Sequence, residues 1–173
     1  MRLATFARAP TGQAGGMGMI WMSWAVDEGQ ARDLLAGDLD PHDVPGSEPA
    51  VVDLDKAWHG LHWLLTGTEY DGGPEPLASA LMGGQPFGDD AGYGPPRLLT
   101  PEWARAIDAA LRAVPDDLLR QRFDAGRMEE LSIYPDSWHP SDFEVYLTPY
   151  LEMLRDHYAY AASRDLGTVQ QLT

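Results

Sequence analysis

The sequence contains no cysteine, and this absence excludes several chemistries at once. Without a thiol there is no disulfide framework, no thiolate nucleophile and no cysteine-ligated zinc or iron–sulfur site. A chain without cysteine suits the reducing cytoplasm, where we expect this protein to work. Long apolar runs are also missing, since those near residues 17–24 and 61–65 are far shorter than the about 20 residues of a membrane-spanning helix. We therefore expect no transmembrane segment.

Positive charge is scarce as well. The chain has 12 Lys and Arg against 27 Asp and Glu, for a formal net charge of −15, and Lys56 is its one lysine. Nucleic-acid binding normally depends on cations that neutralise phosphates, and anionic membranes attract basic segments, so both kinds of partner are disfavoured. The same charge is compatible with a basic protein partner.

The length of 173 residues and the hydrophobic content of 44% fit one folded domain. Residues 1–16 lack the uninterrupted apolar run of a secretory signal. We interpret residues 1–16 as a disordered N-terminal extension that precedes a domain over residues 17–173.

Capping signals predict where several helices begin and end. Asp27 is a candidate N-cap and Gly37 a C-terminal stop for a helix over residues 28–36. Gly67 is expected to end a second helix, which Asp53 or Asp55 would cap at its start. These local signals come from the chain alone and need no partner element.

Two later helices have equally clear starts. Thr100 followed by Pro101 is the pairing expected at a helix start, and Trp103 is predicted to begin the buried side of that helix. Between these two helices, a turn is expected at residues 124–127. Ser141 to Glu144 matches a capping box, and the longest helix is expected to run from it to about Ser163, with Leu154 and Tyr158 among the residues along its inward side.

A short apolar, aromatic-rich stretch near residues 19–24 favours a buried β-strand, and residues 167–172 are a candidate final strand at the other end of the domain. Together they predict a small sheet formed by the two ends of the chain. We therefore predict an α+β fold, a single helix-rich domain with a small mixed or antiparallel sheet.

Asp55, His59 and His62 are spaced i, i+4 and i+7, which brings a carboxylate and two imidazoles to neighbouring parts of one helical face. The spacing makes them a weak candidate metal site, without the HExxH arrangement of zinc proteases. The alternative is structural: Asp55 caps the helix, His59 is solvated and His62 is hydrogen-bonded beside Trp58. We favour the structural alternative and expect no metal and no cofactor.

Other catalytic signatures are weak. No GxSxG elbow presents a serine nucleophile. The loop from Gly92 to Arg97 lacks the amide donors of a phosphate loop, because two of its residues are proline. We interpret it as a rigid loop that carries Tyr93 and Arg97 at the surface.

Several motifs occur together in one order, Gly18-Met19-Ile20, Asp55-Lys56-Ala57-Trp58, Leu61-His62-Trp63-Leu64-Leu65-Thr66-Gly67, Gly92-Tyr93-Gly94-Pro95 and Ile133-Tyr134-Pro135. Their combination resembles the domain-of-unknown-function family 1877, also called YfbM-like, from about residue 17 to the C-terminus. The resemblance implies an α+β fold of bacterial cytoplasmic proteins with no established activity, and it supplies no catalytic residues. The positions that match the family pattern are Trp58, His62, Thr66, Gly67, Tyr93, Gly94, Tyr134 and Pro135.

Two functions remain open, and the sequence does not decide whether the chain is an enzyme. The first is an acidic protein-interaction module, immunity-like in that it binds a basic partner, and it predicts an exposed apolar patch rimmed by carboxylates. The second is a small-molecule-binding protein or hydrolase with a pocket near His62, Tyr93, Arg97 and Tyr134. The ligand-binding candidates from both the motifs and their neighbourhood are Trp58, His62, Thr66, Tyr93, Arg97 and Tyr134.

Overall fold

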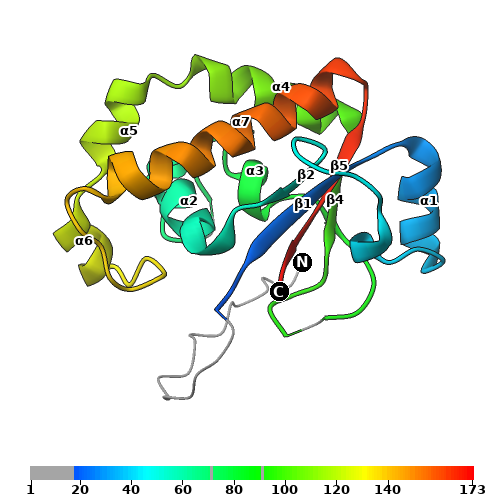
Figure 1. Ribbon diagram of the computed structural model, residues 1–173, viewed down its shortest axis with the longest axis horizontal. Coiled ribbons are helices and arrows are strands. Elements are labelled where there is room, and N and C mark those ends of the chain that lie inside the picture. Colours follow the sequence, from blue (N-terminus) through cyan, green and yellow to red (C-terminus); the bar gives the residue numbers. More distant parts are fainter. Residues whose placement is uncertain (1–17, 71, 91) are drawn as a thin grey trace.

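A computed structural model describes residues 18–70, 72–90 and 92–173 of the chain (Figure 1). The extension expected over residues 1–16 lies outside the described residues. The elements in chain order are β1 (Trp21–Val26), α1 (Glu28–Ala36), the 3-10 turn η1 (Pro41–Asp43), β2 (Val51–Asp53), the 3-10 turn η2 (Asp55–Ala57), α2 (Trp58–Thr66), α3 (Ser79–Met82), β3 (Gln85–Pro86), β4 (Arg97–Leu99), α4 (Pro101–Ala113), α5 (Asp116–Arg122), α6 (Ala125–Glu130), the π-helical turn η3 (Phe143–Leu147), α7 (Thr148–Ser163) and β5 (Gly167–Leu172).

The sheet has five strands in the order β2-β1-β5-β4-β3, and every neighbouring pair is antiparallel. Its centre is the pairing of β1 with β5, in register from Trp21 opposite Leu172 to Val26 opposite Gly167. The two ends of the domain therefore form the sheet together, as the sequence predicts. The fold is a helix-rich α+β arrangement with an antiparallel sheet, which confirms the predicted fold class.

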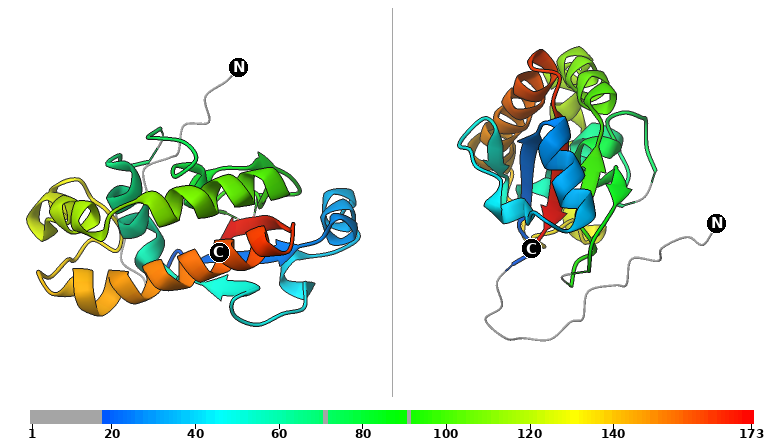
Figure 2. Two further views of the ribbon diagram at one scale, coloured as in Figure 1. Left: turned by 90° about the horizontal axis from the view of Figure 1, so that it is seen from above. Right: turned by 90° about the vertical axis from the view of Figure 1, so that its right-hand side faces the viewer.

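The two faces of the sheet pack against different elements, because side chains alternate along each strand. Trp21 and Ala25 face the main core, which also contains buried residues of α2, α4 and α7. Trp24 and Val26 face a second, smaller core with Leu34 of α1. Figures 1 and 2 show α4 and α7 lying side by side over one face, with α1 apart from them at one end of the sheet.

The predicted start and end of α1 and the predicted C-terminal end of α2 are confirmed. Asp27 and Gln30 form a reciprocal capping box, with Oδ1 of Asp27 accepting from the Gln30 amide at 2.8 Å. Gly37 then ends α1 with a left-handed φ of 80°. Gly67 ends α2 in the same way, and Arg122 Nη1 donates to the carbonyls of Leu64 and Leu65, both at 2.8 Å. The Arg122 guanidinium thus satisfies helix-end carbonyls that have no partner within α2.

Three local predictions were wrong. Trp103 does not pack into the core and is 40% exposed, because the buried face of α4 consists of Ala104, Ile107 and Leu111. Ser141 forms no capping box, because the π-helical turn η3 precedes α7 at this place. The carboxylate of Asp142 instead accepts a hydrogen bond from the His139 amide at 2.7 Å. Residues 124–127 were expected to be a turn, and they begin the short helix α6.

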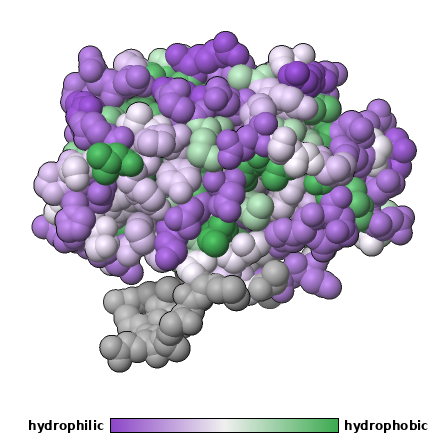
Figure 3. All heavy atoms as spheres, viewed as in Figure 1, coloured by the Kyte–Doolittle hydropathy of each residue, from purple (hydrophilic) through white to green (hydrophobic). Residues whose placement is uncertain are grey.

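Among the described residues, no helix combines the length and the hydropathy that crossing a bilayer requires. The face of the molecule in Figure 3 is largely hydrophilic, with apolar residues scattered between polar ones. Exposed large apolar side chains are nevertheless present, namely Leu35, Tyr70, Tyr93, Trp103, Leu118 and Val145.

Candidate functional site

His59 connects three segments of the chain. Its Nδ1 accepts a hydrogen bond from the Tyr134 amide at 2.9 Å, and its Nε2 contacts the Glu69 carbonyl. Because Nδ1 is an acceptor, the ring proton lies on Nε2, which donates to Glu69. Burial lowers the pKa of His59 from 6.5 to about 4, although the Glu69 carbonyl opposes this shift. His59 is therefore neutral at pH 7, and neither ring nitrogen is available to a ligand.

The metal hypothesis for Asp55, His59 and His62 is not supported by this geometry. Within the described residues, no three His, Cys, Asp or Glu side chains are arranged to hold an ion. The expectation that His59 is solvated is also wrong, because its side chain is buried between Trp58 and the loop that follows α2. Asp55 does not cap α2, and its carboxylate instead accepts from the Tyr146 hydroxyl at 3.5 Å.

His62 and Thr66, both in α2, contact the turn that follows this helix. His62 is 1% exposed, and Thr66 Oγ1 donates to the His62 carbonyl at 2.7 Å. The Thr68 hydroxyl lies 2.9 Å from Thr66 Oγ1 and 3.5 Å from His62 Nε2. The bond to the His62 carbonyl involves its backbone alone, whereas the His62 ring contacts Thr68, and both His62 and Thr66 side chains are directed into the protein.

Aromatic rings lead from this buried turn to the surface. The His59 ring stacks on Trp58 with centroids 4.9 Å apart and lies 4.6 Å from the Tyr70 ring. Trp58 in turn lies 6.3 Å from the Tyr134 ring, and its Nε1 donates to the Met19 carbonyl. Tyr70 is 41% exposed, so one end of this aromatic series faces solvent.

Carboxylates surround the exposed end of the series. Burial raises the pKa of Tyr70, and the negative charges of Asp136 and Glu69 raise it further. Burial likewise raises the pKa of Tyr134, with smaller contributions from Asp55, Tyr93 and Asp136. Asp136 therefore acts on both Tyr70 and Tyr134, and Tyr93, which is 44% exposed, also raises the pKa of Tyr134.

Asp55 joins two more tyrosines to this group. Tyr146 and Tyr150 are half-buried, with ring centroids 5.3 Å apart, and the charge of Asp55 raises the pKa of both beyond the effect of burial. We call the set of Tyr70, Tyr93, Tyr134, Tyr146 and Tyr150, with Asp55, Glu69 and Asp136, the tyrosine cluster. It combines ring faces with negative charge, which is suited to binding cationic side chains.

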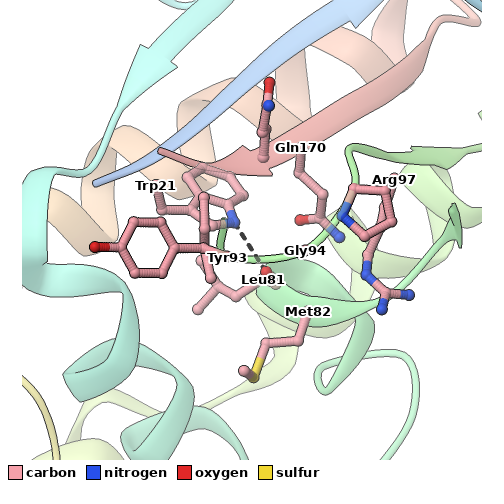
Figure 4. A pocket seen from close by; sticks show the side chains of 10 residues that line it. Trp21, Leu81, Met82, Tyr93, Gly94, Arg97 and Gln170 are labelled. Carbon is pink, nitrogen blue, oxygen red and sulfur yellow. Dashed lines mark hydrogen bonds between the residues drawn. The ribbon is translucent and has the colours of Figure 1, made fainter. Parts of the chain in front are cut away.

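A small cavity of about 30 Å³ lies beside the tyrosine cluster, between the end of β5 and the loop before β4. Figure 4 shows Trp21, Leu81, Tyr93, Arg97 and Gln170 around it, with the Trp21 indole donating to the Leu81 carbonyl at 2.8 Å. Tyr93 belongs both to this wall and to the tyrosine cluster. The loop residue thus links the two features.

The structure divides the six ligand-binding candidates among three places. Tyr93 and Arg97 line the cavity, and Trp58 and Tyr134 lie in the aromatic series. His62 and Thr66 lie in α2 and contact the turn that follows it. The six side chains do not converge on one concave site.

A buried Ser–His pair was not anticipated. Ser23 Oγ lies 2.9 Å from His157 Nε2, and His157 Nδ1 lies 2.8 Å from the Pro49 carbonyl. The arrangement resembles a nucleophile with its base, but both side chains are fully buried in the core beneath α7 and no substrate reaches them. Inward alternation places Ser23 in the core, and His157 falls between Leu154 and Tyr158, positions already predicted to face inward.

The architecture and these sites define a helix-rich α+β protein whose polar contacts mostly fix its own loops. Comparison with known sequences gives the family: residues 17–170 match the sequence model of a family described as a domain of unknown function, DUF1877. The chain belongs to this family, as the motif resemblance predicts.

Two further similarities concern the protein YfbM of Escherichia coli. The sequence of YfbM from strain K12 is 32% identical over 126 residues, which cover 69% of this chain and 74% of that protein. The crystal structure of YfbM, a protein of unknown function, superposes with a TM-score of 0.70 at 23% identity and covers 90% of this chain and all of the other. The structural likeness supports the fold.

Proposed function

We propose that this protein is an interaction module that binds a basic protein partner through the tyrosine cluster. The observation that carries the proposal is the coincidence of exposed rings with carboxylates at one place. Tyr70 and Tyr93 are 41% and 44% exposed, the charges of Asp136 and Glu69 raise the pKa of Tyr70, and those of Asp55 and Asp136 raise the pKa of Tyr134. Tyrosines are enriched at protein interfaces because a rigid, amphipathic ring gives contact area at a small entropic cost.

Charge supports the same partner. A net charge of −15 attracts basic proteins over a distance and accelerates their encounter. At the tyrosine cluster, an arginine or lysine from the partner would lie over a ring and beside a carboxylate at once. An immunity-like role, in which the module neutralises a basic protein in the cytoplasm, is one form of this proposal.

The test uses the chain as bait. The purified protein is immobilised, host lysate is passed over it at low salt, and bound proteins are eluted with a salt gradient and identified by mass spectrometry. We expect one basic protein to be retained in stoichiometric amount, with retention that weakens as salt screens the charges.

A double variant localises the contact. Tyr70→Ser with Asp136→Asn removes one exposed ring and one carboxylate from the tyrosine cluster, and both residues are exposed. The matched control, Trp103→Ser with Glu102→Gln, removes the same kinds of group from α4. We expect the partner's affinity to fall about tenfold or more in the first variant and to be unchanged in the second. Equal retention by all three proteins would show that the tyrosine cluster is not the binding surface.

Fewer of the predicted residues can take part in small-molecule binding than the sequence indicates. A pocket shared by His62, Tyr93, Arg97 and Tyr134 would need His62 accessible, and its side chain is 1% exposed. Tyr93 and Arg97 are the two of these four residues that line the cavity, so any ligand-binding role rests on them.

A further inference from the structure

We propose that the basic partner docks an extended peptide segment on the free edge of β2, in the groove between β2 and α7. The proposal rests on the interaction function proposed above and names the kind of segment that the module binds. β2 is the first strand in the order β2-β1-β5-β4-β3, and it pairs with β1 alone. Figure 2 shows β2, in cyan, at the rim of the sheet beside α7.

The outer edge of β2 offers free peptide groups. The Leu54 amide donates to the Trp21 carbonyl of β1 at 2.9 Å, and backbone groups alternate between the two sides of a strand, so those of Val51 and Asp53 point away from β1. The Val51 amide donates to the Ser47 carbonyl at 3.2 Å. Within the part of the chain that the structure describes, no hydrogen bond reaches the Asp53 amide or the carbonyls of Val51 and Asp53. Asp53 is exposed, so one donor and two acceptors are open to a further strand.

A groove of about 730 Å³ runs beside this edge. Pro49 and Val52 line it from the strand side, and Met153, Asp156 and Tyr160 line it from α7. The volume is in the range of ligand-binding clefts. A peptide that adds to a sheet edge gains affinity from main-chain hydrogen bonds and specificity from pockets for alternate side chains. The edge of β2 supplies the first of these, and the groove supplies the second.

The groove leads to the tyrosine cluster. Tyr150, Met153 and His157 are spaced i, i+3 and i+7, so they lie along one side of α7. His157 Nδ1 lies 2.8 Å from the Pro49 carbonyl, and this side of α7 therefore faces the segment that enters β2. The Tyr150 ring contacts that of Tyr146, with centroids 5.3 Å apart. A segment paired with β2 thus reaches the tyrosine cluster at one end.

Charges along this path place a basic residue at the tyrosine end. Burial raises the pKa of Tyr150, and the charges of Asp55 and Asp53 raise it further. An arginine or lysine is attracted there by both the ring and the carboxylates. At the other end of the groove, the guanidinium of Arg164 lies over the Tyr160 ring, 4.0 Å from its centroid, and repels a second cation. The basic residue of the segment therefore lies beside Asp55.

Amide hydrogen exchange in the full, 15N-labelled chain tests the pairing. The probe is a seven-residue peptide of alternating arginine and valine, acetylated and amidated at its ends. Two derivatives carry N-methyl groups, one on the valine amides and one on the arginine amides, and both keep the charge of the parent. Because the amides of alternate residues point to opposite sides of a strand, methylation blocks pairing with β2 in one derivative only.

We expect one derivative to bind about tenfold or more weakly than the parent and the other to bind about equally. Exchange of the Asp53 amide should slow about tenfold when about 90% of the protein is bound, whereas the Leu54 amide, already bonded to Trp21, should change less. Asp55→Asn should weaken the parent peptide about threefold or more, and the matched control Glu28→Gln, on α1, should not. Asparagine tolerates the left-handed φ of 46° at position 55, and the spectra show whether each variant is folded.

Three results would overturn the proposal. Equal binding of all three peptides would mean that charge alone retains them. An unchanged exchange rate of the Asp53 amide at saturation would mean that the peptide lies elsewhere. Slow exchange of this amide without peptide, lost on dilution, would assign the edge to a second copy of the chain.

These results are separate from the test of the interaction function. A partner captured from lysate that leaves the Asp53 amide unaffected would bind through side chains alone, which refutes docking on β2 and leaves the proposed function standing. Failure to capture any partner would refute the proposed function, whichever peptide binds.

Discussion

A fall in pH is expected to destabilise the fold through His157, which is buried at the centre of the core. Burial lowers its pKa in the folded protein from 6.5 to about 4. Between these values the unfolded chain binds a proton that the folded chain excludes, so the stability present above pH 6.5 is lost as the pH falls towards 4. At about 1.4 kcal/mol per unit of pKa difference, the loss is about 2 kcal/mol at about pH 5 and about 3 kcal/mol at still lower pH.

Desolvation favours the neutral form of His157, and the hydrogen bond to the Pro49 carbonyl opposes this effect by raising the pKa. The Pro49 carbonyl can only accept, so Nδ1 carries the proton, and in the neutral ring Nε2 competes with the Val169 carbonyl for the one proton of the Ser23 hydroxyl. That hydroxyl also lies 2.9 Å from the Val169 carbonyl. In the imidazolium form Nε2 would donate to Ser23, and the hydroxyl would turn to Val169, leaving a desolvated positive charge with neutral partners only.

The assay is urea denaturation of the wild type and His157→Gln at about pH 8 and about pH 5, with the unfolding free energy from linear extrapolation. Glutamine keeps a polar group at the position and does not titrate. His59 and the carboxylates titrate in both proteins, so their contributions cancel in the difference between the two pH profiles. We expect the wild type to lose about 2 kcal/mol more than the variant between these pH values. Parallel profiles would refute the reasoning and show that Ser23 and Val169 accommodate the imidazolium.

Three further predictions concern stability measured by urea denaturation. Gly60→Ala should destabilise by about 1–3 kcal/mol, because the new methyl group would lie 2.5 Å from the Trp138 ring, whereas Gly126→Ala on an exposed part of α6 should change stability by less than about 1 kcal/mol. Arg122→Met should cost about 1–3 kcal/mol by leaving two carbonyls at the end of α2 without donors, and a neutral result would show that water replaces the guanidinium. Trp103→Ser should stay within about 0.5 kcal/mol, since this residue is 40% exposed; a large loss would contradict the packing of α4.

Local signals in the sequence determined much of the secondary structure. Asp27 caps α1 at its start and Gly37 at its end, as predicted. Gly67 caps the end of α2, also as predicted. Caps and left-handed glycines act over three or four residues, so they can be recognised without knowledge of any other element. The pairing of the two terminal strands was also predicted, from the apolar stretch that became β1 and the short candidate strand at the end of the domain that became β5.

Tertiary contacts decided the remaining strands and the fate of the polar residues. Strands β2, β3 and β4 are two or three residues long, and pairing with β1 and β5 rather than any intrinsic pattern makes them strands. His59 has the spacing of a metal ligand in the sequence, yet the Tyr134 amide and the Glu69 carbonyl, which reach it from other segments, occupy both of its nitrogens.

The sequence indicated some residues of the tyrosine cluster and of the cavity beside β5, and the tertiary structure added the others. The motifs identified Tyr93, Arg97 and Tyr134 as candidates, because aromatic and guanidinium side chains in a Gly/Pro-rich loop suit a binding surface. They did not indicate Tyr70, Asp136 or Gln170, which lie in other segments and reach the sites only when the chain folds. The sequence by itself determined the family and the local elements, whereas the tertiary structure decided which polar atoms remain available, since a hydrogen-bond partner distant in the chain leaves no local pattern.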